Sequence, residues 1–156
     1  IPDIVLAIAL LSFFSLLGVK MGLHTIIVSH VVFNLAFVCA VVRARLKSFD
    51  WSIIEASSDL GSSTFTTLYR VVIPVLMPAI LAGGLLAFTL SVDEFIIAFF
   101  TAGAGRSSIT LPMQIYAMIR FGVTPEINAL ATIVMSVSVI ALALSQRLNK
   151  GGLPGQ

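Results

Sequence analysis

Four long runs of apolar residues constrain this chain more than any other feature. Residues 23–42 and 71–92 form runs of 20 and 22 residues, and residues 127–146 form another run of 20. A helix rises about 1.5 Å per residue, so about 20 residues cross the hydrocarbon core of a bilayer. Because 58% of the residues are hydrophobic, 10% are charged and the mean hydropathy is +1.09, most of the chain cannot face water. The sequence therefore predicts an all-α, polytopic transmembrane helical bundle.

The remaining run, at residues 1–19, is the shortest. Its uncharged part covers the 16 residues 4–19, and the chain opens with Ile-Pro-Asp rather than with Met. We expect this segment to belong to a span that begins earlier in a longer protein, with Asp3 at a kink where its carboxylate faces protein or water. A short re-entrant or core helix is the alternative. Residues 1–156 are then one transmembrane domain with four spans, at residues 1–19, 23–42, 71–92 and 127–146.

Basic residues are distributed unevenly between the two sides of the predicted bundle. Six lie in the loop at residues 43–70 or in the C-terminal tail, namely Arg43, Arg45, Lys47, Arg70, Arg147 and Lys150. Three lie on the opposite side, namely Lys20, Arg106 and Arg120. Because cytoplasmic loops are enriched in Lys and Arg, the loop and the C-terminus are predicted to be cytoplasmic. The net charge is only +2 and the basic residues are not clustered in one patch, so there is no reason to expect a nucleic-acid partner.

The predicted cytoplasmic loop begins with a short helix that ends at a glycine. Asp50 can cap a helix over residues 51–60, on which Glu55 and Asp59 lie one turn apart on the same face. Gly61 can end this helix because glycine readily adopts the left-handed conformation found after many helix C-termini. The pattern predicts two helices that meet at an angle.

The second helix of the loop can be capped by Ser62 or Ser63. The two helices offer five apolar side chains for burial, namely Ile53, Ile54, Leu60, Phe65 and Leu68. A loop this short has no core, so a partner or the base of the bundle must cover them. Pro74 and Pro78 follow at the start of the next span, where the first turn tolerates a residue without N–H and the second proline forces a bend.

These residue types resemble the EAA signature of importer-type ABC transporter permeases. The signature reads E-A-A, three residues, G, nine residues and I-x-L-P, and this chain has Glu55-Ala56-Ser57, Gly61 and Ile73-Pro74 at the same spacing. Ser57 replaces the second Ala, and Val71 and Ile73 replace Ile and Leu, which are small changes in size. The resemblance implies a coupling helix that sits in a cleft of a cytoplasmic ATP-binding subunit. The contact residues it implies are Glu55, Ala56, Ser57, Asp59, Leu60 and Gly61. It also implies a hinge at Pro74 and Pro78.

The resemblance extends along the chain to the membrane subunit of spermidine/putrescine importers. It is carried by segments such as ARLKSFD, FTLSVDEFIIAFFTAG and TLPMQIYAMIRFGV. It implies about the last four of six helices, a second permease subunit that is a paralogue, a periplasmic or extracellular solute-binding protein, and the bacterial inner membrane. The chain has no G-x-x-x-x-G-K-[ST] loop to hold ATP phosphates, so we expect ATP hydrolysis in a partner and no catalytic residue or cofactor here.

Two adjacent carboxylates, Asp93 and Glu94, are candidates for the solute path, together with Asp3. They follow Arg70 by 23 and 24 residues, so a straight helix places them about 35 Å along, near the external interface. Charges there are costly unless they are hydrated or paired. Because the pair has no basic neighbour in the sequence, it suits a cationic solute such as a polyamine. The alternatives are that both carboxylates are solvated at the helix end, or that they pair with Arg106 or Arg120.

Two other functions stay open at this point. The same machine could carry an iron complex, an opine or an inorganic anion, or a proton-coupled carrier could use Asp3, Asp93 or Glu94 as a relay. Residues 101–124 are predicted to form an external loop with one short interfacial helix. His24 and His30 do not share a helix face, so no metal site is expected.

Overall fold

The computed structural model describes residues 2–120, 122 and 125–150, and for residues 148–150 it describes the backbone alone. In the described part of the chain every regular element is helical, which confirms the predicted fold class. The elements in chain order are α1 (Asp3–Leu16), α2 (Leu23–Leu46), α3 (Ser52–Asp59), α4 (Thr64–Thr67), the π-helical turn η1 (Leu68–Val72), α5 (Ile73–Asp93), α6 (Ile96–Thr101), the 3-10 turn η2 (Arg106–Ser108), α7 (Leu111–Ile119) and α8 (Pro125–Lys150).

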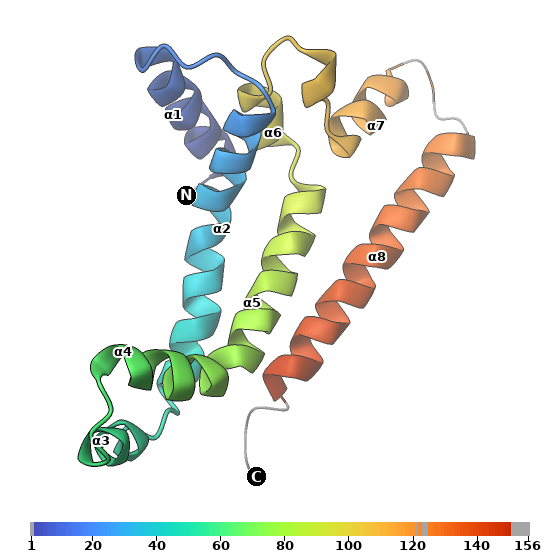
Figure 1. The fold of residues 1–156 in the computed structure, drawn as a ribbon. Helices are drawn as coiled ribbons and strands as arrows, with labels where there is room; N and C mark the ends of the chain where they lie inside the picture. Colours follow the sequence, from blue (N-terminus) through green and yellow to red (C-terminus); the bar gives the residue numbers. More distant parts are fainter. Residues whose placement is uncertain (1, 121, 123–124, 151–156) are drawn as a thin grey trace.

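Three long helices, α2, α5 and α8, give the molecule its length (Figure 1). α5 packs against α2 on one side and against α8 on the other. α3, α4 and η1 lie together at one end, which we call the hairpin end. α1, α6, η2 and α7 lie at the opposite end, which we call the far end. The two ends are thus separated by most of the length of α5.

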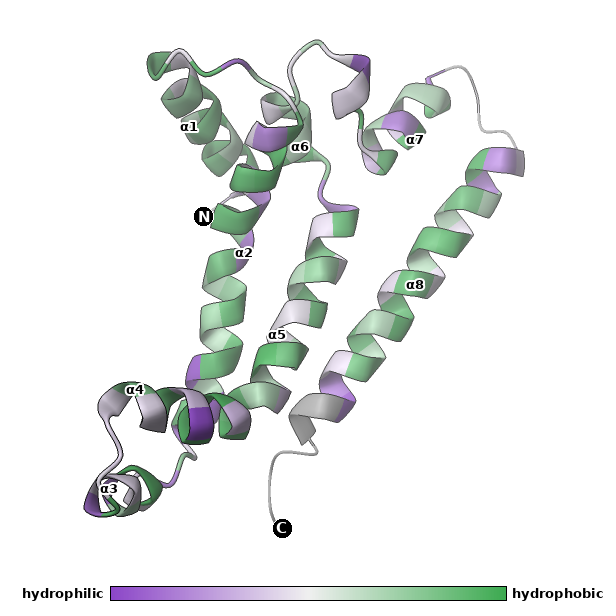
Figure 2. Ribbon diagram, in the orientation of Figure 1, coloured by the Kyte–Doolittle hydropathy of each residue, from purple (hydrophilic) through white to green (hydrophobic). Residues whose placement is uncertain are grey.

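The long helices have the length and composition of membrane spans. Leu23–Leu46, Thr64–Asp93 and Pro125–Arg147 are each long and apolar enough to cross a bilayer, and α1, with 14 residues, is shorter than a span. Within the 18-residue apolar segment of each helix, only 28%, 22% and 11% of the residues, respectively, are buried inside the chain. Figure 2 shows apolar residues along the middle of these helices and hydrophilic residues mainly near their ends and in the connections. Lipid tails offer no hydrogen-bond partners, so a membrane span must pair its backbone groups within the helix and expose apolar side chains, as these helices do.

Small residues set the contact between α2 and α5. A Cβ atom added to Gly83 would lie 3.4 Å from Cγ1 and 3.6 Å from Cα of Val38, so the two backbones are close at this level. Ala79 and Ala82 are also buried on this helix. On its other side, Ser145 of α8 donates a hydrogen bond of 2.7 Å to the carbonyl oxygen of Ala82. Close backbones and interhelical hydrogen bonds are typical of helix packing in lipid, where the hydrophobic effect between helices is weak.

α6 was not predicted from the sequence, which ended the third span at residue 92 and placed an external loop with one short helix at residues 101–124. Ile97 and Ala98 of this helix are fully buried, and Ala98 belongs to a small core with Ile26 of α2. The hydroxyl of Thr25 donates a hydrogen bond of 2.6 Å to the carbonyl oxygen of Thr101. α6 thereby joins α1 and the start of α2 at the far end, so the chain beyond α5 is folded against the bundle rather than extended from it.

Candidate functional site

The hairpin end is built from two helices and a glycine, much as the sequence predicts. The predicted helix over residues 51–60 appears as α3, and Asp50 Oδ1 accepts a hydrogen bond of 3.0 Å from the backbone N–H of Ser52. Hydrogen bonding to Ser52 favours the charged carboxylate and lowers the pKa of Asp50. Gly61 has a φ of +78°, the left-handed conformation in which a Cβ atom is disfavoured. Glycine therefore reverses the chain at this position at low conformational cost.

Hydrogen bonds of serine and threonine fix the second half of the hairpin. Ser63 is the cap, and its hydroxyl accepts a hydrogen bond of 3.3 Å from the backbone N–H of Thr66. The hydroxyls of Ser57 on α3 and Thr67 on α4 form a buried hydrogen bond of 2.9 Å. Ser57, which stands where the signature has alanine, is therefore more than a small change in size, because it links the two helices.

The second helix of the hairpin is joined to the following span, whereas the sequence interpretation began the span at residue 71. Thr64–Asp93 is one helical stretch that contains a π-helical turn, in which the N–H of Ile73 bonds to the carbonyl of Leu68, five residues back. Pro74 follows directly, and a proline ring crowds the carbonyl four residues before it, so a widened turn here relieves that clash. Figure 1 shows α4 lying across the hairpin end and α5 rising from it. Pro78 lies within α5, and the hinge role of both prolines stays a prediction.

The outer surface of the hairpin is exposed and partly apolar. Glu55, Ala56, Asp59 and Gly61 are exposed, and Leu60 keeps 86% of its surface accessible. Among the other apolar residues of the hairpin, Phe65 is 75% exposed, so the bundle does not cover it. A depression of about 400 Å³ lies between the two helices and is lined by Ile53, Ala56, Ser57, Leu60, Ser62, Thr66, Arg70 and Val71. An exposed apolar surface on so small a hairpin fits a protein partner.

The second region of interest is a break in the helix after Asp93. α5 ends there, Glu94 is extended, and α6 starts two residues later. Glu94 Oε1 accepts a hydrogen bond of 2.9 Å from the N–H of Ile97, so this carboxylate caps the first turn of α6. Helix α5 thus ends at Asp93, one residue beyond the predicted span, and the separate helix α6 that follows was not predicted from the sequence. The break lies alongside α2, because Ser91 contacts His30 Nδ1 at 2.6 Å just before it.

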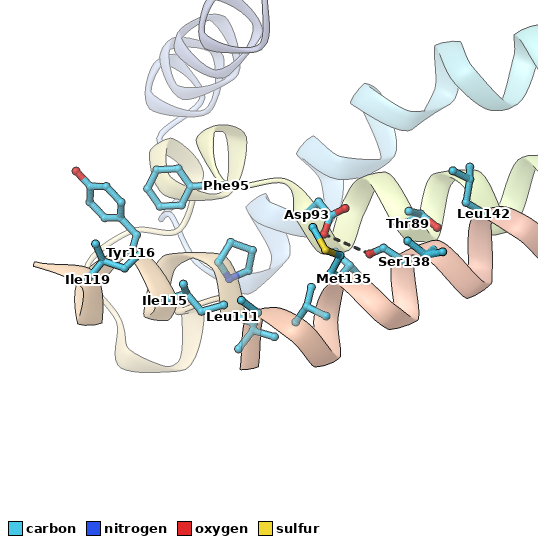
Figure 3. A pocket seen from close by; sticks show the side chains of 15 residues that line it. Thr89, Asp93, Phe95, Leu111, Ile115, Tyr116, Ile119, Met135, Ser138 and Leu142 are labelled. Carbon is cyan, nitrogen blue, oxygen red and sulfur yellow. Dashed lines mark hydrogen bonds between the residues drawn. The ribbon is translucent and has the colours of Figure 1, made fainter. Parts of the chain in front are cut away.

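Asp93 faces a cavity of about 660 Å³ between α5, α7 and α8 (Figure 3). Asp93 is exposed, and its Oδ1 accepts a hydrogen bond of 3.3 Å from the hydroxyl of Ser138 on α8. Among the residues that the structure describes, neither Asp93 nor Glu94 forms an ion pair. Arg120 instead lies over the ring of Tyr116, at 5.8 Å from the ring centroid. Among the described side chains, therefore, neither Arg106 nor Arg120 forms the ion pair that was the predicted alternative.

Two aromatic residues that line this cavity were not among the site residues predicted from the sequence. Phe95 follows the break and Tyr116 lies on α7, and their rings are 4.9 Å apart between centroids. α7 itself matches the short helix predicted within residues 101–124. No local pattern pairs residues 95 and 116, because only the fold of the far end brings α7 back over the break.

Asp3 differs from the other predicted path residues. It is exposed in the first turn of α1, and it does not line the cavity that contains Asp93. α1 packs mainly on α6. Of the three predicted carboxylates, Asp93 faces the cavity, Glu94 caps the adjacent helix and Asp3 lies elsewhere.

Three apolar spans, an exposed helical hairpin at one end and a cavity beside a helix break at the other define a helical protein long and apolar enough to cross a membrane. Residues 1–150 match the family described as the binding-protein-dependent transport system inner membrane component, and the chain belongs to this family.

Individual relatives agree with this assignment. The chain is 44% identical over 154 residues to the spermidine/putrescine transport system permease protein PotC of Escherichia coli (strain K12), covering 99% of this chain and 58% of the relative. It is 39% identical to PotC of Haemophilus influenzae over 149 residues, covering 96% and 57%. It is 41% identical to the putrescine transport system permease protein PotI of E. coli (strain K12) over 159 residues, covering 96% and 56%. The chain thus spans less than two thirds of the length of these relatives.

Proposed function

We propose that this chain belongs to a permease subunit that carries polyamines across a bacterial inner membrane in an ATP-driven importer. The observation that carries the proposal is the similarity along nearly the whole chain to spermidine/putrescine permeases. The subunit forms part of the solute path, and a separate ATP-binding subunit supplies the energy. A second permease subunit and a solute-binding protein complete the assembly.

The hairpin end supports the coupling role. Its exposed residues include five of the six contact positions implied by the EAA signature, while the sixth, Ser57, holds the two helices together. A partner that grips α3 can move α5, because the Ser57–Thr67 hydrogen bond ties α3 to α4 and α4 belongs to the same helical stretch, Thr64–Asp93, as α5. Closure of the ATP-binding subunits then tilts α5, and the π-turn beside Pro74 is the point at which the stretch bends most readily.

The far end supports a cationic solute. Asp93 presents a carboxylate to a largely apolar cavity, and no described basic side chain neutralises it. A linear polyamine brings ammonium groups for the carboxylate and methylenes for the apolar walls. We therefore place the solute path beside Asp93.

The proposed orientation puts the hairpin end in the cytoplasm. α8 ends on the same side of the molecule as the hairpin, and the arginines at the end of α2 lie there too. This distribution follows the tendency of basic residues to remain on the cytoplasmic side. The far end then faces the solute-binding protein outside the membrane.

Uptake by the full-length complex in proteoliposomes tests the function directly. Labelled spermidine and putrescine are offered with the solute-binding protein outside and ATP inside. We expect uptake that requires ATP and that an excess of unlabelled polyamine suppresses. Uptake of an anion, an opine or an iron complex that polyamines do not suppress would assign the subunit to another solute. Uptake driven by a pH gradient without ATP would replace the importer with a proton-coupled carrier.

A further inference from the structure

Among the residues that the structure describes, one carboxylate, that of Asp93, lines the cavity beside the helix break. Asp93 is free of ion pairs among the described residues, whereas Glu94 Oε1 already accepts the N–H of Ile97. Moving Glu94 toward a ligand would uncap α6 and leave the N–H of Ile97 without its acceptor. A solute with two separated positive charges therefore needs a second point of attraction that is not a carboxylate.

The rings of Phe95 and Tyr116 are such a point. The faces of aromatic rings attract cations, because the quadrupole of the ring places negative potential there. Tyr116 shows this property in the structure, since the Arg120 guanidinium lies 5.8 Å from its centroid. The two rings are inclined by 39° at 4.9 Å and act as one aromatic corner of the cavity.

The carboxylate and the aromatic corner lie in different parts of the same cavity. Figure 3 shows Phe95 and Tyr116 together toward one end, and Asp93 with Ser138 nearer the other. The walls around them are formed by apolar side chains such as Leu111, Ile115 and Met135. A cavity of about 660 Å³ is within the size range of small-molecule sites and admits an extended aliphatic chain.

We propose that this cavity binds a linear diammonium or longer polyammonium cation at two points, with one ammonium at Asp93, another at the Phe95–Tyr116 corner, and the methylenes between them along the apolar wall. This deepens the proposed function and rests on it. The site would recognise the separation of charges in the solute as well as its charge.

The test measures binding to the full-length complex in nanodiscs without the solute-binding protein, so that the permease alone is probed. Labelled linear diamines of increasing length are compared with monoamines of the same number of carbons. We expect diamines that span the two points to bind more tightly than matched monoamines. Asp93→Asn lowers the affinity for both kinds of amine.

Tyr116 separates two-point binding from simple charge attraction. Tyr116→Leu removes the ring and lowers diamine affinity roughly two- to fivefold, the range of an exposed cation–π contact, because Tyr116 is 48% exposed, with little change for monoamines. Tyr116→Phe keeps the ring and restores the diamine preference. Phe88→Leu is the matched control, because Phe88 is an exposed ring on α5 that does not line the cavity. Co-purification of the ATP-binding subunit checks that each variant assembles.

Equal loss of monoamine and diamine binding in Tyr116→Leu, or no preference for diamines in the unmodified complex, overturns the two-point site. These outcomes are separate from failure of the proposed function. If the unmodified complex does not take up polyamines with ATP, the function is wrong whatever the variants bind. If it does take them up but Tyr116→Leu treats both amines alike, only the two-point site is wrong.

Discussion

The two ends of this molecule differ in how their structures arise. At the hairpin end, Asp50, Gly61 and Ser63 act on backbone groups within a few residues of themselves. At the far end, Phe95 meets Tyr116 and Asp93 meets Ser138 across 21 and 45 residues of sequence. The comparison teaches that a surface for a fixed protein partner can be encoded locally, whereas a cavity for a small solute is assembled from several helices.

The largest effect is expected at Gly61. Gly61→Ile places a β-branched side chain at a φ of +78°, where nothing lies within 4 Å of the added Cβ, so the effect is conformational rather than steric. The left-handed conformation costs about 1–2 kcal/mol for a residue with a Cβ, and more for a β-branched one. We expect co-purification of the ATP-binding subunit to fall at least tenfold and uptake to fall with it.

Gly18→Ile is the matched control for Gly61→Ile. Gly18 has a φ of +66° and equally open surroundings, but it lies after α1 at the far end. The same strain there should leave the ATP-binding subunit attached. If both variants lose that subunit equally, the contact is not specific to the hairpin end.

Leu60 gives the next largest effect. It is 86% exposed at the end of α3, so Leu60→Ser removes little packing within this chain. We expect a loss of about 1–3 kcal/mol in association with the ATP-binding subunit, since a buried leucine at an interface contributes that much. A binding titration of the complex measures it. Leu16→Ser, at 87% exposure at the far end, should leave that association constant unchanged.

Substitutions of Glu94 test the comparison from the far end. Glu94→Ala removes the acceptor for the N–H of Ile97 and destabilises the start of α6 by about 1 kcal/mol. Glu94→Gln retains an amide oxygen and should recover most of that loss. We expect lower uptake with the ATP-binding subunit still bound, as measured by transport and co-purification on one preparation. Detachment of that subunit would show that the two ends are not separable.

The smallest effect is expected for Ser57→Ala, which restores the alanine of the EAA signature. It leaves the buried hydroxyl of Thr67 without its partner of 2.9 Å, and a lost hydrogen bond of this kind costs about 1 kcal/mol. The melting temperature of the purified complex should fall by a few degrees, while coupling persists. An unchanged melting temperature would mean that this bond does not stabilise the hairpin.

The predictions from sequence succeeded where the cause was local and failed where it was not. The apolar runs and the turn at Gly61 follow from length, composition and backbone conformation. The sequence did not predict α6, because the helix that Glu94 caps packs on Ile26 and Thr25, residues some 70 positions earlier. The helix periodicity of one segment cannot predict a contact between residues so far apart in the sequence.

The sequence by itself determined a helical membrane protein with a glycine-jointed hairpin, since the bilayer demands apolar helices and a positive φ favours glycine. Only the tertiary structure decided which of the three acidic candidates faces a cavity, and that two aromatic rings accompany it. The physical reason is that a binding cavity depends on the relative positions of several helices. Those positions are set by contacts such as Gly83 against Val38, which no single segment of the chain specifies.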